Sequence, residues 1–152
     1  MERMEVLDQL KAARRAHQKW LQNAHSLINN MVVKENDVPV KYTNCSFGIW
    51  LYSDAQKLRQ LEGIDYLDAI TTEHQKLHEE YQKIYNIYFA QDNRSFFGKL
   101  FNSKPIIFHD DQQLAKKSYL TLKVISENLL NLIELLERRI TTLPRSAFDA
   151  IE

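Results

Sequence analysis

The chain has 152 residues, of which 44% are hydrophobic and 26% are charged. This length and composition are those of one globular domain with room for a substantial core. The 20 basic residues balance the 20 acidic ones and leave a net charge of zero, so the chain has no electrostatic footprint for nucleic acid or for an anionic membrane surface. Only three glycines and three prolines occur, and this scarcity of turn-forming residues favours long helices over a sheet.

The single cysteine excludes an intramolecular disulfide, so the composition gives no reason to place the chain in an oxidising compartment. The first residues, Met-Glu-Arg-Met-Glu-Val, lack the apolar core of a signal peptide. No run approaches the roughly 20 apolar residues that a membrane-spanning helix needs. We therefore expect a cytoplasmic protein with no membrane span.

The first predicted helix runs from about Glu2 to Val33. Its apolar residues recur at alternating steps of four and three, which places them on one stripe of a helix. The stripe consists of Val6, Leu10, Ala13, His17, Trp20, Ala24, Leu27 and Met31. His17 therefore lies inside an apolar stripe, where the nitrogen atoms of its ring need partners.

The second predicted helix follows a loop between Lys34 and Asn44, where the periodicity stops. Asn44 is a suitable N-cap, so Cys45 is expected to open this helix. The helix should run to about Glu62, because Gly63 is a natural helix stop.

The third predicted helix is capped by Asp65 and extends to about Ala90. Its apolar stripe consists of Leu67, Ile70, His74, Leu77, Tyr81, Ile84 and Tyr88. His78 follows His74 by four residues, so both histidines are expected on the face of the helix that points inward.

Residues 91–110 break the periodicity and form a long linker for a compact domain. The linker is rich in aromatic and aliphatic residues, namely Phe96, Phe97, Leu100, Phe101, Ile106, Ile107 and Phe108. Because these side chains are apolar, we expect the linker to pack on the bundle or to cover the surface of a partner.

The fourth predicted helix runs from about Asp111 to Thr142 with a heptad-like stripe. The stripe consists of Ala115, Ser118, Leu122, Ile125, Leu129, Leu132, Leu136 and Arg139. Leu130, Ile133 and Leu135 widen the apolar arc, and this surplus favours contact with a second chain, as in a homodimer. The whole pattern predicts an all-α, up-down four-helix bundle over residues 1–142 and a frayed C-terminal tail over residues 143–152.

Three of the five histidines and the only cysteine fall on inward faces of the first three predicted helices. His74 and His78 are one helical turn apart, the spacing at which two imidazole rings reach one small cation. His17 and Cys45 come from two other helices and complete a set of three nitrogens and one sulfur. Zinc suits this set, because it accepts tetrahedral nitrogen and sulfur ligands and brings no redox chemistry of its own.

Cys45 has a second property that fits a metal ligand. A thiol in the first turn of a helix faces unpaired amide N–H groups and the positive end of the helix dipole, which stabilise the thiolate. The thiolate is also the form that oxidants attack, so the same residue is a candidate redox trigger. A lone histidine pair or a lone buried cysteine is more often a core feature, and it is their coincidence that indicates a metal site.

These residues also resemble the pattern of a known family, the bacterial chemoreceptor zinc-binding (CZB) domain. The elements that match are His17-Gln-Lys-Trp20, Cys45-Ser-Phe-Gly-Ile-Trp50 and His74-Gln-Lys-Leu-His78. Their order, intervals and residue types all agree with the family over about residues 6–140, although the last helix matches only in pattern and length.

The resemblance implies a zinc site formed by His17, Cys45, His74 and His78. It also implies that Trp20 and Trp50 brace the site and that Gly48 lets two helices approach closely beside it. Such domains are zinc- or oxidant-responsive sensors in chemotaxis or cyclic-di-GMP signalling, typically as homodimers joined to an output domain. No output domain is recognisable in this sequence, so the resemblance implies either a stand-alone member acting on a separate signalling protein or a fragment of a larger one.

Three other interpretations compete with a sensory zinc module. A di-iron, hemerythrin-like oxygen-binding bundle needs bridging carboxylates and more histidines, whereas Glu73, Glu79 and Glu80 form no ExxH motif, and Cys45 has no role in such a site. A catalytic zinc needs an open coordination position and a general base, so we expect no enzymatic activity. A purely structural zinc that holds the helices together remains open at this point.

Overall fold

The computed structural model describes residues 1–31, 33, 41–90 and 107–151. Within this part the chain forms five α-helices and no strand, as expected for an all-α protein. The elements are α1 (Arg3–Ile28), α2 (Ser46–Leu51), the 3-10 helix η2 (Asp54–Gln60), α3 (Leu67–Tyr85), the π-helix η3 (Asn86–Ala90), α5 (His109–Thr142) and α6 (Ser146–Asp149). Among the described residues, none of the helices combines the length and the apolar character needed to cross a membrane.

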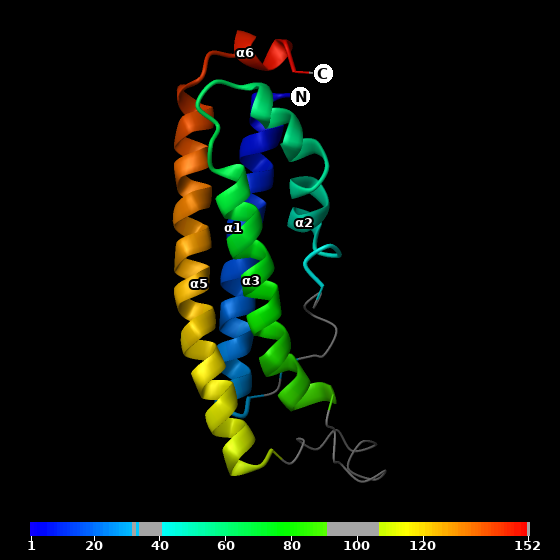
Figure 1. The fold of residues 1–152 in the computed structure, drawn as a ribbon, viewed down its shortest axis with the longest axis vertical. Helices are drawn as coiled ribbons and strands as arrows, with labels where there is room; N and C mark the ends of the chain where they lie inside the picture. The colour runs from blue at the N-terminus through cyan, green and yellow to red at the C-terminus, as the bar shows by residue number, and fades with distance from the viewer. Residues whose placement is uncertain (32, 34–40, 91–106, 152) are drawn as a thin grey trace.

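The three long helices α1, α3 and α5 lie side by side, and α5 packs along both of the others (Figure 1). Helices α1 and α3 run in one direction, whereas the α2–η2 segment and α5 run in the opposite direction (Figure 1). The α2–η2 segment lies on the side of α1 and α3 that faces away from α5 (Figure 1). The chain direction therefore alternates as expected, but the second position is occupied by two short elements and not by a long helix.

Helix α1 begins with a capping box, in which the backbone N–H of Glu2 donates to Oε2 of Glu5 at 3.0 Å. The predicted stripe is buried from Val6 to Leu27. The helix ends at Ile28 and not at Val33, because Asn30 adopts a left-handed conformation with φ of 56°. Met31, the last member of the predicted stripe, is consequently 59% exposed.

The second predicted helix, Cys45 to Glu62, is interrupted at Ser53. The hydroxyl of Ser53 donates to the carbonyl of Ile49 at 2.6 Å, and its backbone leaves the helical region with φ of −120° and ψ of −95°. A serine that bonds to its own helix in this way competes with the regular backbone ladder. The result is the six-residue α2 followed by the tighter η2.

Helix α3 buries every residue of its predicted stripe up to Ile84, and Tyr88 of η3 continues it. Its N-cap is Tyr66, one residue after the expected Asp65, and it carries no side-chain cap. The preceding turn depends on Gly63, which has φ of 72°. Arg139 of α5 holds this turn by donating two hydrogen bonds to the carbonyl of Glu62, at 2.6 and 3.2 Å.

Helix α5 buries a slightly different stripe from the predicted one. The buried residues are Ala115, Ser118, Leu122, Ser126, Leu129, Ile133, Leu136 and Ile140. The predicted Ile125, Leu132 and Arg139 are only half-buried, because α5 packs on two helices at once and its buried face is centred between them. Of the apolar surplus, Ile133 belongs to the core, whereas Leu135 is 42% exposed.

The C-terminal residues differ from the expected frayed tail. Residues Ser146–Asp149 form α6, and Phe148 and Ile151 are buried. The amino group of Met1 donates to the carbonyl of Ile151 at 3.4 Å, and Arg3 donates to the carbonyl of Leu143 at 3.2 Å. These contacts place α6 across the end of the bundle where α1 begins (Figure 1).

The aromatic linker lies mostly outside the described residues, as do residues 34–40 of the first loop. Of the linker's apolar residues, the structure describes only Ile107 and Phe108. Ile107 packs partly against the core, and Phe108 is 63% exposed at the N-cap of α5. The prediction that the linker covers the bundle or a partner stays a prediction.

Candidate metal centre

The structure brings the four predicted ligands together from three parts of the chain. His17 lies in the middle of α1, Cys45 is the N-cap of α2, and His74 and His78 occupy successive turns of α3. Each offers one nitrogen or sulfur atom, and these four atoms lie within 4.8 Å of one another. All four residues are at most 5% exposed. No carboxylate of the described residues belongs to this cluster.

Cys45 reaches the cluster because it caps a helix and does not lie inside one. Its Sγ accepts a hydrogen bond from the N–H of Gly48 at 3.1 Å and lies 3.2 Å from Nε2 of His74. The N-cap is therefore Cys45 itself, one residue after the expected Asn44. The net effect of the environment on the thiol is also different from the expected one. Burial raises the pKa of Cys45, and the hydrogen bonds from the backbone of Gly48 and Phe47 oppose this only in part.

His17 is oriented by its own helix. Its Nδ1 lies 2.7 Å from the carbonyl oxygen of Ala13, so Nδ1 carries the proton and donates it to that oxygen. Nε2 is then the unprotonated nitrogen, and it is buried without a hydrogen-bond partner. Burial lowers the pKa of His17 to about 4, although the hydrogen bond to Ala13 opposes the shift. A neutral imidazole with an unsatisfied lone pair, held by a backbone carbonyl, is the arrangement of a metal-binding histidine.

His74 and His78 face each other on α3, with ring centroids 4.7 Å apart. Burial, together with the neighbouring His17 and His78, lowers the pKa of His74 to about 2. The ring of His17 lies 5.2 Å from that of His74 and 6.3 Å from that of His78. Since both pKa values lie well below 7, His17 and His74 are neutral at pH 7 and available as ligands.

Aromatic residues form the walls around the four side chains. Trp20 meets the ring of His78 edge-on at 4.3 Å, and Phe47 lies 5.4 Å from His17 and 5.2 Å from His74. Trp50 stacks on Phe47 at 5.9 Å. Trp20 therefore braces the site directly, whereas Trp50 acts through Phe47.

Two further wall residues, Tyr42 and Tyr52, were not predicted. The Tyr42 ring lies 6.5 Å from that of His78, and the Tyr52 ring lies 6.3 Å from that of His74. Tyr42 belongs to a turn without periodicity, and Tyr52 is the C-cap of α2, so the stripe pattern gives no reason to place Tyr42 at a site.

Gly48 allows a close approach, chiefly to the turn before its own helix and less tightly to His74 of α3, whereas the resemblance implied an approach of two helices. A Cβ atom at this position would lie 1.8 Å from the carbonyl oxygen of Tyr42 and 3.2 Å from Cε1 of His74. Any side chain at residue 48 would therefore force the backbone of Tyr42 and the start of α2 apart, and would also press on the ring of His74. This contact keeps Cys45, three residues earlier, beside the histidines.

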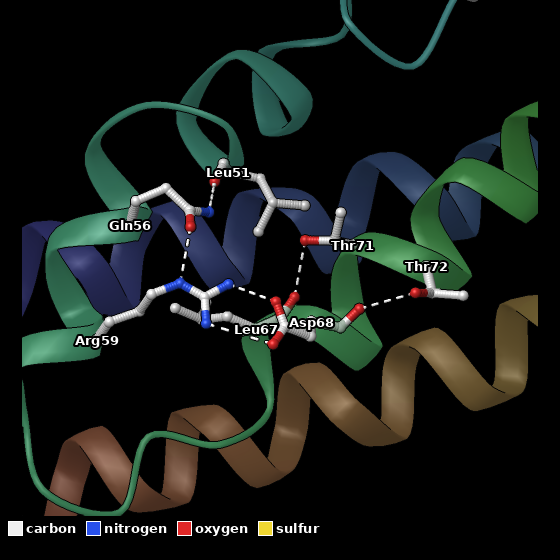
Figure 2. A network of polar contacts seen from close by, with 7 residues as sticks. All are labelled: Leu51, Gln56, Arg59, Leu67, Asp68, Thr71 and Thr72. Atoms are coloured by element: carbon white, nitrogen blue, oxygen red, sulfur yellow. Dashed lines mark hydrogen bonds and ion pairs between the residues drawn. The ribbon is translucent and has the colours of Figure 1, made fainter.

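The opposite end of the α2–η2 segment is held by a polar network (Figure 2). Gln56 donates to the carbonyl of Leu51 at 2.7 Å and accepts a hydrogen bond from Arg59 at 2.9 Å. Arg59 also pairs with Asp68 in the first turn of α3. The segment that carries Cys45 is thus attached to α3 independently of the metal centre.

Comparison with protein families agrees with this geometry. The family model of the chemoreceptor zinc-binding domain matches residues 17–85. The chain contains a chemoreceptor zinc-binding domain. The matched segment includes all four candidate ligands, covers somewhat less than half of the chain, and leaves α5 and the first half of α1 outside it. No curated protein and no solved structure matches the chain.

The four side chains of the CZB domain fit a zinc ion. Tetrahedral zinc with bonds of about 2.0–2.3 Å places its donor atoms roughly 3.3–3.6 Å apart, so small side-chain movements close the cluster from its span of 4.8 Å. The other two histidines do not take part. His25 is exposed near the end of α1, and His109 is exposed at the start of α5.

Proposed function

We propose that this protein is a cytosolic zinc-binding sensory or regulatory module that holds one zinc ion through His17, Cys45, His74 and His78. The observation that carries the proposal is the convergence of these four buried donors within 4.8 Å. The unpartnered, buried Nε2 of His17 supports it, because a buried lone pair without a partner is costly unless a ligand satisfies it. The match to the chemoreceptor zinc-binding domain supports zinc over other metals.

The bound zinc would hold the thiolate of Cys45 to three imidazoles on the long helices. His17 is fixed by its hydrogen bond to Ala13, and His74 and His78 lie inside the 19-residue α3. Cys45 caps a helix of only six residues. We therefore assign Cys45 as the ligand that moves when zinc is lost or the thiolate is oxidised, because α2 is the shortest of the three helices that carry the ligands.

The proposed output passes through α5 to a second protein chain. Arg139 of α5 donates hydrogen bonds to the carbonyl of Glu62, in the turn that follows η2. A displacement of the α2–η2 segment would therefore be transmitted directly to α5. Helix α5 also exposes apolar side chains, namely Leu114, Leu120, Val124 and Leu135. These residues support a homodimer or a signalling partner in chemotaxis or cyclic-di-GMP control. A closed set of four donors leaves no coordination position for a substrate, so we propose no enzymatic role.

A purely structural zinc is the second candidate, favoured by the burial of all four donors. Structural sites supply folding energy, so the metal-free protein would be largely unfolded in that case. The long apolar stripes of α1, α3 and α5 argue for a fold that survives metal removal. The helical circular-dichroism spectrum before and after chelation distinguishes the two functions.

The site itself is tested by the metal content of the purified protein. We expect about one zinc per chain in the wild type, as for a four-ligand site, and weakened retention in Cys45→Ala and His78→Ala. His25→Ala is the matched control, because His25 is an exposed histidine outside the cluster. Failure of the wild type to retain zinc after reconstitution, or two irons per chain, would overturn the zinc site and favour the di-iron alternative.

A further inference from the structure

We infer that the rings of Tyr42 and Tyr52 form a gate over the metal centre and set the rate at which metal ions enter and leave it. This inference rests on the proposed zinc site and concerns the exchange of its ion, not its affinity. The gate is defined by these two side chains alone.

The two rings contact each other and the cluster. Their centroids are 5.7 Å apart in an edge-to-face arrangement, a geometry that is favourable for aromatic pairs. Tyr42 approaches His78 and Tyr52 approaches His74, at 6.5 and 6.3 Å. The pair therefore spans the two histidines that α3 contributes.

The two tyrosines are more exposed to solvent than the other aromatic residues around the metal centre. Trp20 and Phe47, the remaining aromatic neighbours of the histidine rings, are 6% and 4% exposed. Tyr52 is 38% exposed and Tyr42 is partly exposed. Of these four aromatic neighbours, the two tyrosines are the ones that reach the solvent. They are therefore the exposed part of the aromatic wall, and the proposed route from solvent to the donors passes between them.

A cover of two aromatic rings affects metal exchange because exchange depends on access to the metal. A closed tetrahedral zinc site exchanges its ion readily only when an entering ligand can reach the metal, since zinc can expand its coordination to five. The tyrosine rings block this approach while they are packed on each other. Their π faces also attract cations, so a small metal ion passes more easily than a bulky anionic chelator.

Tyr42 and Tyr52 contact the site through their backbones as well as through their rings, so the rings can move while the backbone contacts stay in place. The backbone carbonyl of Tyr42, not its ring, lies against Gly48 and Sγ of Cys45. Tyr52 is the C-cap of α2, and its N–H bonds to the carbonyl of Gly48 through the backbone. Substitution of either ring therefore leaves the contacts that position Cys45 in place.

The test compares zinc exchange in the zinc-loaded wild type, Tyr52→Ala and Tyr52→Phe. Stopped-flow mixing with the chelator 4-(2-pyridylazo)resorcinol measures zinc release, and mixing of metal-free protein with zinc measures capture. We expect both rates to rise on the order of tenfold in Tyr52→Ala, because one packed aromatic ring is removed, with the equilibrium affinity nearly unchanged. Tyr52→Phe retains the ring and should behave as the wild type.

Tyr119→Ala is the matched control, since Tyr119 is a half-buried tyrosine on α5 that contacts His25 and not the cluster. Tyr42→Ala repeats the test from the other side of the gate if Tyr52→Ala folds poorly. Unchanged rates in both alanine variants would overturn the gate, as would faster release with unchanged capture, which would make the rings a stabilising contact. A wild type that binds no zinc would overturn the proposed function as well.

Discussion

The Sγ atom of Cys45 lies 3.2 Å from Nε2 of His74. This contact joins the cap of a six-residue helix to the middle of α3. It is close enough for both atoms to bind one zinc ion, and the N–H of Gly48 donates to the same sulfur at 3.1 Å. Cys45 is thus a helix cap and, in the proposed site, a metal ligand, and substitutions can separate the two roles.

Cys45→Ser should remove the metal ligand but keep the cap. A serine hydroxyl accepts the Gly48 N–H as a good N-cap does, so the stability of the metal-free protein should change little. Zinc affinity should fall by at least about 100-fold, since loss of even a supporting residue costs about 10–100-fold. Competition titration with a chromogenic chelator measures the affinity, and urea unfolding in EDTA measures the stability.

Cys45→Ala is the matched variant that lacks both roles. It should lose zinc as Cys45→Ser does, and its metal-free form should be about 1 kcal/mol less stable because the cap is missing. Equal metal-free stability of the two variants would show that a side-chain cap at residue 45 adds no stability in solution.

Gly48→Ala should destabilise the protein and weaken zinc binding together. The added Cβ meets the backbone carbonyl of Tyr42 at 1.8 Å, so the backbone must shift, and overpacking of this kind costs about 1–3 kcal/mol. The shift moves Cys45 away from His74. Thermal unfolding and zinc titration check both effects, with Ser46→Ala, an exposed position of α2, as the control. Wild-type affinity in Gly48→Ala would contradict the role of this contact.

The helices and the convergence of the four candidate ligands were predictable where a regular pattern carried them. The predicted stripes of α1, up to Leu27, and of α3 are buried. Each of these helices has one buried face, and a 3.6-residue period identifies one face well. His17 and His74 were found because they interrupt those stripes with a polar ring. A histidine in such a stripe needs partners for its ring nitrogens. This need made the inward histidines and Cys45 recognisable as one set.

The remaining features depend on contacts that periodicity does not encode. The break at Ser53 comes from a single hydroxyl bonded to the carbonyl of Ile49, and the burial of Phe148 comes from packing at the far end of the chain. The shift of the α5 stripe from Ile125 to Ser126 reflects packing on two helices at once. Tyr42 lies in an irregular turn, where only the folded structure shows what its ring contacts.

The metal-free protein should lose stability as the pH falls from about 6.5 toward 4. Burial lowers the pKa of His17 to about 4 and that of His74 to about 2, from 6.5. Between these values the unfolded chain binds protons that the folded state does not, so the free energy of unfolding decreases with falling pH. The slope can reach about 1.4 kcal/mol per pH unit for each histidine.

Urea unfolding of EDTA-treated protein between pH 7 and pH 4.5 measures this dependence. His17→Leu removes one of the two groups and should flatten the curve, whereas His25→Ala, at an exposed position, should leave it unchanged. A stability independent of pH in the wild type would show that the two imidazoles are not buried in the metal-free state.

Zinc removal should loosen α2 while the long helices stay ordered. Without the metal, α2 keeps its backbone ladder and the Gly48 contact, but it loses the bond that ties Cys45 to α1 and α3. Hydrogen exchange measured by mass spectrometry should therefore speed up in residues 46–51 after chelation. Residues 122–136, in the middle of α5, should stay protected, because their buried face packs on the other two long helices.

The 3-10 helix η2, at the far end of the α2–η2 segment, supplies an internal control for this experiment. Arg59 pairs with Asp68 and bonds to Gln56 (Figure 2), so η2 should exchange less rapidly than α2 in the metal-free protein. Arg59→Ala removes this attachment and should extend the fast exchange into η2 only when zinc is absent. Uniform acceleration over all helices would instead indicate a zinc that holds the whole fold together, and no acceleration in α2 would contradict Cys45 as the mobile ligand.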